Sequence, residues 1–516
     1  MTSNLSSKSG RATYEHSTLT WQEQSSGHYA DVSSVSERCQ LARFELLSAA
    51  RQWTRELAEL AELAGVPASK VVAPRLTRFD ASRPIVMTGH QPGLWHSGIA
   101  VKYETVDKWC DSHQMNAIAL VIDTDEGDPL SFLTPEKGDV IDAEATHSPT
   151  VDEDRWGGLS LPARSTRQSF AQNTGLFLTG TVKPTEQITR IAHDAASQLR
   201  LLRKPDAAAN LQRVAAILSR MPNCLAAKAA IVVRRALGLG RGLYEVPLSI
   251  VASLPSAQQL FRDIFLDAER FHRDYNGSLE EYRRSHGIDN PANPFPDLRS
   301  DGGRYELPFW LVRVDEGRRR PLWCEPQADG DGVASGDLVV PRHAMITSLM
   351  RMLFCDLFVH GTGGGTYDQF TDEFVRHRWN VSAAPVSVVT ESRYLFEEQR
   401  DRLLRLKHVE AEIRNMTYHP EQFLDKDYFA PDIERQIVEE IQRKMQAVAA
   451  LKELRAQQLP AAHINTRIQQ ATANIRQLAF DACQSQLDAL RQLSKSAIDA
   501  IESREYPWFF FPDFDA

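Results

Sequence analysis

Residues 85–110, IVMTGHQPGLWHSGIAVKYETVDKWC, constrain the fold of this chain more than any other segment. A short apolar run leads into a loop interrupted by Gly89 and Gly93, after which apolar residues recur at helical spacing. This pattern predicts a strand, a polar loop and a helix. In an open parallel sheet such a loop lies at the carboxyl ends of the strands, beside a helix N-terminus that favours anions. We therefore expect residues 85–110 to form one wall of an active site.

The loop and the start of the helix carry the first candidate site residues. His90 and His96 are candidate catalytic residues, because imidazoles at a helix start can donate to phosphoryl oxygens as negative charge develops. The alternative is that both rings only satisfy backbone groups of the loop. Lys102 could meet a phosphate or carboxylate as a point charge, although a solvated helix lysine is the commoner case. The other candidate ligand-binding residues of this segment are Gly89, Gln91, Ser97 and Gly98.

Acidic residues follow the next apolar run, 116–123, which predicts a strand buried on both faces. Carboxylates at the carboxyl end of such a strand can hold an amine, a ribose or Mg²⁺. Asp123 and Asp125 are therefore candidate catalytic residues, and Glu126 is a candidate ligand-binding residue. The alternative is an acidic turn in water.

A glycine-rich segment, GTGGGT at 361–366, follows a third predicted strand at 356–360. We predict a loop there whose backbone N–H groups form a nest for an anion. The segment is neither a Walker A loop, because no Lys-Ser/Thr pair follows, nor a GxGxxG fingerprint with a ribose-binding acid. A flexible tight turn is the alternative, but the position directly after a strand favours ligand contact. The candidate ligand-binding residues are His360, Gly361, Gly363, Gly364, Gly365 and Tyr367, together with Arg342 and Arg393 as candidate anion clamps.

Strands and helices alternate up to residue 394, which predicts parallel strands joined by right-handed crossovers. The first helix is predicted at 36–65, and 186–282 is predicted to be mostly helical, with one buried strand at 246–253. The other predicted strands are 139–145, 175–183, 386–390 and a hairpin of 304–314 with 321–325. The connection between 139–145 and 175–183 is predicted to be a loop, and further helices are predicted at 345–354 and 372–378.

The chain changes character after residue 394, where the strand patterns stop. Three helices are predicted at 403–416, 433–454 and 464–501, and the last carries a coiled-coil seam of apolar residues. The seam allows either a homodimer or an intramolecular helical hairpin. The aromatic segment YPWFFFP, 506–512, is too apolar to face water, so we expect it to dock on a domain or on a second subunit.

Composition bounds the class of protein. At 516 residues the chain should form two or three domains, because single cores stop growing near ~250–300 residues. A net charge of −9 argues against broad nucleic-acid binding. The six cysteines form no CxxC pair, which disfavours a zinc ribbon or a disulfide framework and fits a cytoplasmic location. We find neither a signal-peptide pattern nor an apolar run near the ~18 residues of a membrane span, so no membrane partner is expected.

Two motifs and the helical tail together resemble one family. The motifs are TGHQPGLWHSGIAVK at 88–102 and HGTGGGTYDQF at 360–370. They resemble the TGQQ…G…K signature and the GGPGE…Y loop of the cysteine-adding ligases of bacillithiol biosynthesis (BshC-like proteins), which also end in a coiled coil. Carried over by position, the family's glycine, glutamine and lysine, its acidic strand end and its second loop fall on Gly89, Gln91, Lys102, 123–128 and 363–367.

The resemblance implies a Rossmann-like parallel-sheet core with inserted subdomains, and hence an α/β fold. The expected divisions are a polar N-terminal arm, two parts of the core, an inserted helical and β-hairpin subdomain, and a C-terminal antiparallel coiled-coil domain with the aromatic tail. They correspond to 1–35, 36–185 with 336–395, 186–335 and 396–516. This sequence carries His90 in place of the family's first glutamine and adds His96. Its HQP segment also resembles WbqC-like proteins of sugar biosynthesis.

The resemblance further implies a ligase or transferase that joins an amino acid or amine, with cysteine as a candidate, to a small sugar-derived or carboxylate acceptor. A nucleotide such as ATP or ADP, or another phosphate group, would lie between His90 and Gly363. Mg²⁺ is compatible with this site, but no metal ligands are predicted. His90 and backbone N–H groups would stabilise developing negative charge, and Asp123 or Asp125 would orient the amine or act as base.

Two other functions remain open at this point. One is a WbqC-like glycan-modifying transferase, and the other is a non-catalytic nucleotide-binding scaffold that dimerises through its coiled coil. The expected partners are small-molecule substrates and a second copy of the chain bound through the C-terminal helices, with no nucleic acid.

Overall fold

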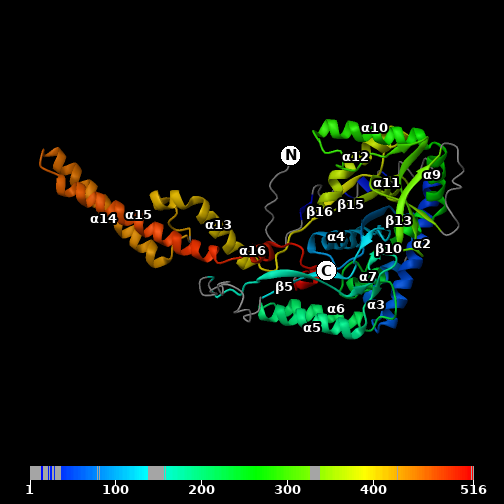
Figure 1. Cartoon of the computed structure of the whole chain (residues 1–516), viewed down its shortest axis with the longest axis horizontal. Coiled ribbons are helices and arrows are strands. Elements are labelled where there is room, and N and C mark those ends of the chain that lie inside the picture. The colour runs from blue at the N-terminus through cyan, green and yellow to red at the C-terminus, as the bar shows by residue number, and fades with distance from the viewer. Residues whose placement is uncertain are drawn as a thin grey trace.

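The computed structural model describes residues 13–14, 21, 24–25, 28, 37–77, 80, 82–137, 156, 158–325, 337–426, 428–512 and 514. The predicted strand at 139–145 and most of the predicted arm at 1–35 lie outside the described residues. Within them the fold is mixed α/β, as predicted, and it is organised around a parallel sheet (Figure 1).

The order of strands in the parallel sheet differs from their order in the sequence. The order is β16 (Val386–Thr390), β15 (Leu357–His360), β2 (Ile85–His90), β3 (Asn116–Val121) and β10 (Tyr244–Pro247), all parallel. The short β1 (Thr13–Tyr14) adds antiparallel to β16. The first of these parallel strands in the sequence is β2. The next two, β3 and β10, lie on one side of it, and the last two, β15 and β16, lie on the other side. This order fits the predicted Rossmann-like core, and the reversal lies between β2 and β15, where open parallel sheets bind ligands.

Successive residues of the strands face two different apolar cores, as the alternation of a strand requires. On one face, Val86 and Val359 pack with α4 (Ser97–His113), α5 (Thr185–Leu201), α6 (Pro205–Leu218) and the C-terminal aromatic segment. On the other face, Met87 and Phe358 pack with residues of α2, α9, α10, α11 and α12. These helices span Glu37–Leu63, Pro255–Leu266, Ala268–His286, Ala344–Leu349 and Thr362–Trp379. Both faces are therefore covered, and the site has to lie at an edge of the sheet.

The chain between β3 and β15 forms several smaller elements. A hairpin pairs β5 (Ser131–Glu136) with β6 (Arg164–Ser169), and the predicted hairpin is present as β12 (Arg304–Arg313) and β13 (Arg318–Cys324), which β14 (Leu338–Pro341) joins. The predicted loop is therefore wrong at β6, whose sequence RSTRQS has no apolar alternation to announce a strand. The predicted strand at 175–183 is two short strands, β8 (Gly175–Leu176) and β9 (Thr181–Val182).

Other helices of this region connect the sheet to the hairpin layers. They are α7 (Ala226–Ala236) and α8 (Leu248–Ala252), and the π-helical turn Met350–Phe354 completes the helix predicted at 345–354. The strand predicted at 246–253 is shifted, because β10 ends at Pro247 and α8 begins at the next residue. Proline commonly precedes or opens a helix, since its fixed φ suits the first turn and its missing N–H costs nothing there.

The glycine-rich segment is a helix, which corrects the predicted loop at 361–366. Helix α12 begins at Thr362, so Gly363, Gly364 and Gly365 lie in its first turns. Each glycine costs about 1 kcal/mol relative to alanine inside a helix. The later turns offset this cost, because Phe370 and other apolar side chains of α12 are buried in the core.

The C-terminal helices form an arm that extends away from the sheet (Figure 1). Its elements are α13 (Glu397–Tyr418), α14 (Pro431–Ala456) and α15 (Ala462–Arg491), whose seam residues Ile464, Ile475 and Leu487 are buried. The helix predicted at 464–501 is broken after Arg491, and α16 (Lys495–Glu502) returns the chain to the body. Pairing of the arm with a second copy of the chain stays a prediction.

The aromatic segment at 506–512 docks on its own chain. Tyr506, Trp508, Phe509 and Phe510 are all buried in the core on the α4 face of the sheet. None of the helices in the described part of the chain combines the length and the apolar character that crossing a membrane requires.

Candidate functional site

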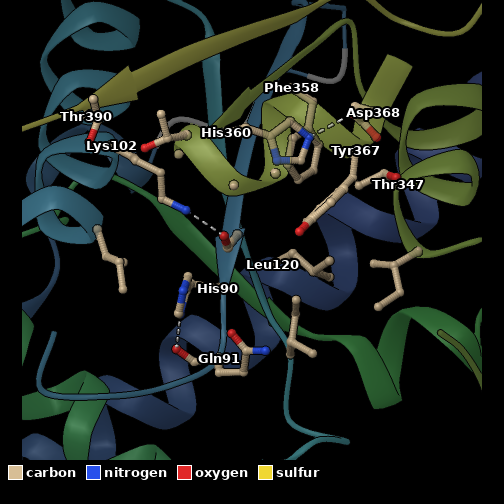
Figure 2. Close-up of a pocket in the computed structure, with 18 of the residues that line it drawn as sticks. His90, Gln91, Lys102, Leu120, Thr347, Phe358, His360, Tyr367, Asp368 and Thr390 are labelled. Carbon is tan, nitrogen blue, oxygen red and sulfur yellow. Dashed lines mark hydrogen bonds and ion pairs between the residues drawn. The ribbon is translucent and has the colours of Figure 1, made fainter. Parts of the chain in front are cut away.

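A cavity of about 490 Å³ opens at the carboxyl ends of β2 and β15, where the order of strands reverses (Figure 2). Its walls come from the end of β2, the first turns of α4, the end of β15 and the N-terminal turns of α11 and α12. Both His90 and Gly363 line it, so the two segments that the sequence singled out do meet. The volume falls within the ~300–1,000 Å³ that is typical of small-molecule sites.

The structure divides the predicted site residues into two groups. Those that line the cavity are Gly89, His90, Gln91, His96, Gly98, Lys102, His360, Gly361, Gly363, Gly364 and Tyr367. Those that do not are Ser97, Gly365, Asp123, Asp125, Glu126, Arg342 and Arg393.

Lys102 is buried between the two glycine-broken segments, so the interpretation as a solvated helix lysine is wrong. Its side chain is 3% exposed, and Nζ donates to the backbone oxygen of Gly89 at 2.9 Å. The lysine stem passes close to Gly361 at the start of α12. Burial lowers the pKa of Lys102 to about 7, because the charged form loses its hydration. A bound anion would restore the charge.

His90 stands at the end of β2 as a neutral ring. Its Nδ1 lies 3.1 Å from the backbone oxygen of Gln91, and since a carbonyl only accepts, Nδ1 carries the proton. Burial, with the Lys102 charge beside it, lowers the pKa of His90 to about 3. The remaining nitrogen, Nε2, is therefore an acceptor. His90 fits an accepting role in the cavity rather than the donating role that the sequence suggested.

His96 has the opposite tautomer. It is the N-cap of α4, and its Nδ1 accepts from the backbone N–H of Gly98 at 3.1 Å. The interpretation as a ring that satisfies a backbone group is thus correct for Nδ1. Burial lowers the pKa of His96, so the neutral ring carries its proton on Nε2. His96 therefore offers a donor to the cavity where His90 offers an acceptor.

The N-terminus of α12 presents backbone N–H groups to the same cavity. Its N-cap is Gly361, and no side chain caps the helix. The first N–H groups of a helix have no intrahelical partner and carry the positive end of the helix dipole. Gly363 has open space where a Cβ would stand, so a ligand can approach the backbone there. A Cβ on Gly364 would instead overlap the ring of His360.

His360 and Asp368 form a buried pair behind this helix start (Figure 2). Nε2 of His360 donates to Oδ2 of Asp368 at 2.7 Å, and Arg351 lies 3.2 Å from the same oxygen. Burial alone would raise the pKa of Asp368, but the imidazole and the guanidinium hold it well below its usual range. The charge of Asp368 is therefore already compensated. It is the only carboxylate among the described residues that line the cavity.

Several lining residues were missed by the sequence analysis, and His343 is the most informative of them. It is the N-cap of α11, with φ of 52°, and its ring stacks on Phe295 at 5.3 Å. A positive φ in a non-glycine residue costs about 1–3 kcal/mol and is concentrated at functional sites. Burial lowers the pKa of His343 to about 4, so this ring is also neutral. No local sequence signal marks it, whereas its neighbour Arg342 drew attention by its charge.

The acidic residues predicted as site residues after β3 do not line the main cavity and have partners within the protein, so their catalytic and ligand-binding roles stay predictions. Asp123 accepts from the backbone N–H of Ser249 at 3.0 Å and from its hydroxyl, and so caps α8. Burial raises the pKa of Asp123 to about 6. Asp125 accepts from Gln91 Nε2 at 2.8 Å and pairs with Arg319. Glu126 is exposed and lies 3.6 Å from the same guanidinium.

The two predicted anion clamps are likewise occupied elsewhere. Arg342 pairs with Glu306 and lies over the Trp310 ring at 4.3 Å. Arg393 pairs with Glu391 at 2.9 Å and lies over the ring of the C-terminal Phe514. Each guanidinium therefore stabilises the fold beside the cavity.

Taken together, the fold is α/β, and a cavity of small-molecule size lies at the reversal of its parallel sheet. No protein-family model matches the chain, and no curated protein matches it in sequence. In the part of the chain that the structure describes, no group of three or more His, Cys, Asp or Glu residues is arranged to hold a metal ion. The resemblance to cysteine-adding ligases stays a prediction.

Proposed function

We propose that the protein is an enzyme, a ligase or transferase that joins an amino acid or another amine to a small sugar-derived or carboxylate acceptor. Cysteine is one candidate for the amine, and a nucleotide or another phosphate-bearing group would bind in the cavity. The observation that carries the proposal is the charge of the cavity. Lys102 and the N-terminus of α12 face a space whose only carboxylate among the described residues, Asp368, is already paired.

The anion would bind between Lys102 and the start of α12. Backbone N–H groups at a helix N-terminus form charge-assisted hydrogen bonds to phosphate or carboxylate oxygens. Gly363, where a Cβ would stand in open space, leaves these N–H groups unshielded. The lysine on the opposite wall adds its positive charge when the anion binds, because the anion restores the charge that burial disfavours.

The three neutral histidines that line the cavity, His90, His96 and His343, would accept or donate protons during the reaction. For a carboxylate acceptor, a bound nucleotide would transfer a phosphoryl or nucleotidyl group to the carboxylate, and that group would leave when the amine attacks. Nε2 of His90 would accept the proton of the attacking amine, because it is the unprotonated nitrogen of a ring that lines the cavity. A bound anion raises the pKa of a neighbouring imidazole, so His90 would be a stronger base in the complex than in the free protein. The Nε2–H of His96 would donate to developing negative charge.

The experiment is a thermal-shift screen followed by a turnover assay. Nucleotides, phosphate, amino acids and amino-sugar conjugates are screened on the wild type, on His90→Ala and on His193→Ala, an exposed histidine of α5 that serves as the matched control. We expect a phosphate-bearing ligand to stabilise the wild type and the control, and His90→Ala to lose turnover, measured by mass spectrometry of the product.

The outcomes separate the candidate functions. A thiol-containing product supports the ligase, and a modified glycan without a thiol supports the WbqC-like transferase. Binding without any product supports the nucleotide-binding scaffold. Equal turnover in His90→Ala and in wild type would falsify the assignment of His90, and the absence of any anion response would contradict the proposed site.

A further inference from the structure

The C-terminal segment that follows α16 is built into the wall of the cavity. The backbone N–H of Trp508 donates to the oxygen of Trp95 at 2.8 Å, and Pro507 forms an antiparallel bridge with His96. The Tyr506 hydroxyl is hydrogen-bonded to Ser165 at 2.7 Å. The buried aromatic rings of this segment hold it against the loop that carries the site histidines. Its backbone is therefore a fixed support rather than a loose end.

This support carries two charged side chains to two different hollows. Arg504 lines the main cavity, and Glu505 lines a smaller cavity of about 200 Å³, on whose wall His90 and His96 also lie. Glu505 pairs with Arg167 at 3.0 Å. Arg504 is exposed, and within the described residues it has neither an ion pair nor a hydrogen bond. A cation that has no ion-pair partner among the described residues thus stands at the cavity that we assign to an anion.

We propose that Arg504 binds a second anionic group of the ligand, and that the ligand of this cavity therefore carries two separated anionic groups. One group lies between Lys102 and the N-terminus of α12, and the other lies at Arg504. This inference rests on the proposed function, because it requires the first anion site. The guanidinium is suited to the role, since it presents a planar fork of donors to a phosphate or a carboxylate.

The rigidity of the segment is what distinguishes Arg504 from an ordinary surface arginine. A surface cation on a mobile chain loses side-chain and backbone entropy when it binds, which leaves little net affinity. Here the backbone on the C-terminal side of Arg504 is already fixed by Pro507 and Trp508. Only the side chain has to be ordered on binding, so a measurable contribution is expected.

The test uses inorganic anions of increasing length. Isothermal titration with phosphate, pyrophosphate and tripolyphosphate is carried out at low salt on the full-length wild type, Arg504→Gln, Arg504→Lys, Lys102→Met and Lys495→Gln. Lys495 is an exposed cation at the start of α16 that does not line the cavity, so it controls for the loss of one positive charge.

We expect Arg504→Gln to bind the best of the longer anions about fivefold more weakly, as a solvent-exposed ion pair allows, and to bind phosphate within about twofold of wild type. Arg504→Lys should recover part of the loss, Lys495→Gln should match wild type, and Lys102→Met should weaken all three anions.

Two results would overturn the inference and leave the proposed function standing. In the first, Arg504→Gln binds every anion like wild type. In the second, it weakens phosphate as much as the longer anions, which would mean that Arg504 acts only through its general field. If the wild type binds none of the three anions, the first anion site fails and the proposed function fails with it.

Discussion

Two polar segments of this protein follow β3 and β15, the strands that flank β2 in the parallel sheet, yet only the segment after β15 contributes its predicted site residues to the main cavity. The acidic segment after β3 caps α8 through Asp123 and pairs with Arg319 through Asp125. The segment after β15 starts a helix whose first N–H groups and glycines line open space. Charge made the first segment conspicuous in the sequence, but its carboxylates are already paired within the protein, whereas the backbone of the second segment is open to the cavity.

The physical reason lies in where the connections after the strands go. The helix after β2, α4, packs on one face of the sheet, and the helix after β15, α12, packs on the other. Adjacent strands whose connections turn to opposite faces leave a crevice between them. Leu120 at the end of β3 and Ile122 after it line the cavity, but the carboxylates that follow are paired with Ser249 and Arg319.

The largest expected difference between the two regions comes from Lys102→Met. Removing the buried charge should weaken anion binding about 100-fold, since truncating one partner of a buried charge pair costs about 2–5 kcal/mol. Isothermal titration with the best anion measures this loss. Binding within about threefold of wild type would show that Lys102 does not face the ligand.

The same variant should gain stability, because burial lowers the pKa of Lys102 from 10.5 to about 7. From pH 7 to 10.5 the unfolded state binds more protons than the folded state, so wild-type stability rises with pH over that window. We expect Lys102→Met to be about 2 kcal/mol more stable at pH 7, less than the ~4 kcal/mol that the shift implies, because the hydrogen bond to Gly89 is lost. Urea unfolding at pH 7 and pH 10 measures the gain, which should shrink at the higher pH.

Asp123 should show the reverse behaviour, with an effect on stability and none on binding. Asp123→Ala leaves the N–H and hydroxyl of Ser249 unpaired and should cost about 1–3 kcal/mol of unfolding free energy. Because burial raises the pKa of Asp123 to about 6, wild-type stability should fall as pH rises from about 4 to 6, and Asp123→Asn should remove that fall. Urea unfolding measures both effects. A loss of anion affinity beyond about threefold in Asp123→Asn would show that the acidic segment after β3 also takes part in binding.

The two glycines at the start of α12 offer a matched pair. A methyl group on Gly364 overlaps the His360 ring, so Gly364→Ala should lose about 1–3 kcal/mol of stability. The same change at Gly363 meets open space and should gain about 0.5–1 kcal/mol through helix propensity. Thermal unfolding measures both, and equal effects of the two substitutions would contradict the packing described for this helix start.

Anion affinity should fall as pH rises, because the charged form of Lys102 binds the ligand. With the pKa of the free protein at about 7, affinity should fall about fivefold between pH 7 and pH 8. Titrations in buffers matched for ionic strength measure the slope. Lys102→Met should abolish this pH dependence. A slope that persists in the variant would show that a group other than Lys102 titrates.

The smallest effect is expected at Asp125. Asp125→Asn removes a partly exposed pair with Arg319 and should change the unfolding free energy by at most about 1 kcal/mol. Anion affinity should stay within about twofold of wild type in the same titration. A larger loss of anion affinity in Asp125→Asn would show that the acidic segment after β3 contributes to the binding site.

The sequence predicts the parts of the fold and site that depend on local patterns. The strand at 386–390, the helix after Gly98 and the meeting of the His90 and Gly363 segments are confirmed. Helix α12 was misplaced, because glycine content argued for a loop and only the packing of the later turns supplies the helix. Strand β6 was missed because its residues are polar throughout.

The rest of the site depends on contacts between residues remote in sequence. Asp123 and Ser249 are 126 positions apart, so no local pattern could reveal that this carboxylate caps α8. His343 and Arg504 reach the cavity from a turn and from the end of the chain. No periodicity or spacing connects them with His90, and a charge-based search selects Arg342 instead.

The most direct test of the central claim is a crystal structure of the protein soaked with tungstate, a phosphate mimic whose anomalous signal locates it without bias. The account predicts a tungstate peak within hydrogen-bonding distance of Lys102 Nζ and of the N–H of Gly363 or Gly364. A peak only at other sites, or an empty cavity at concentrations that saturate anion binding in solution, would contradict it.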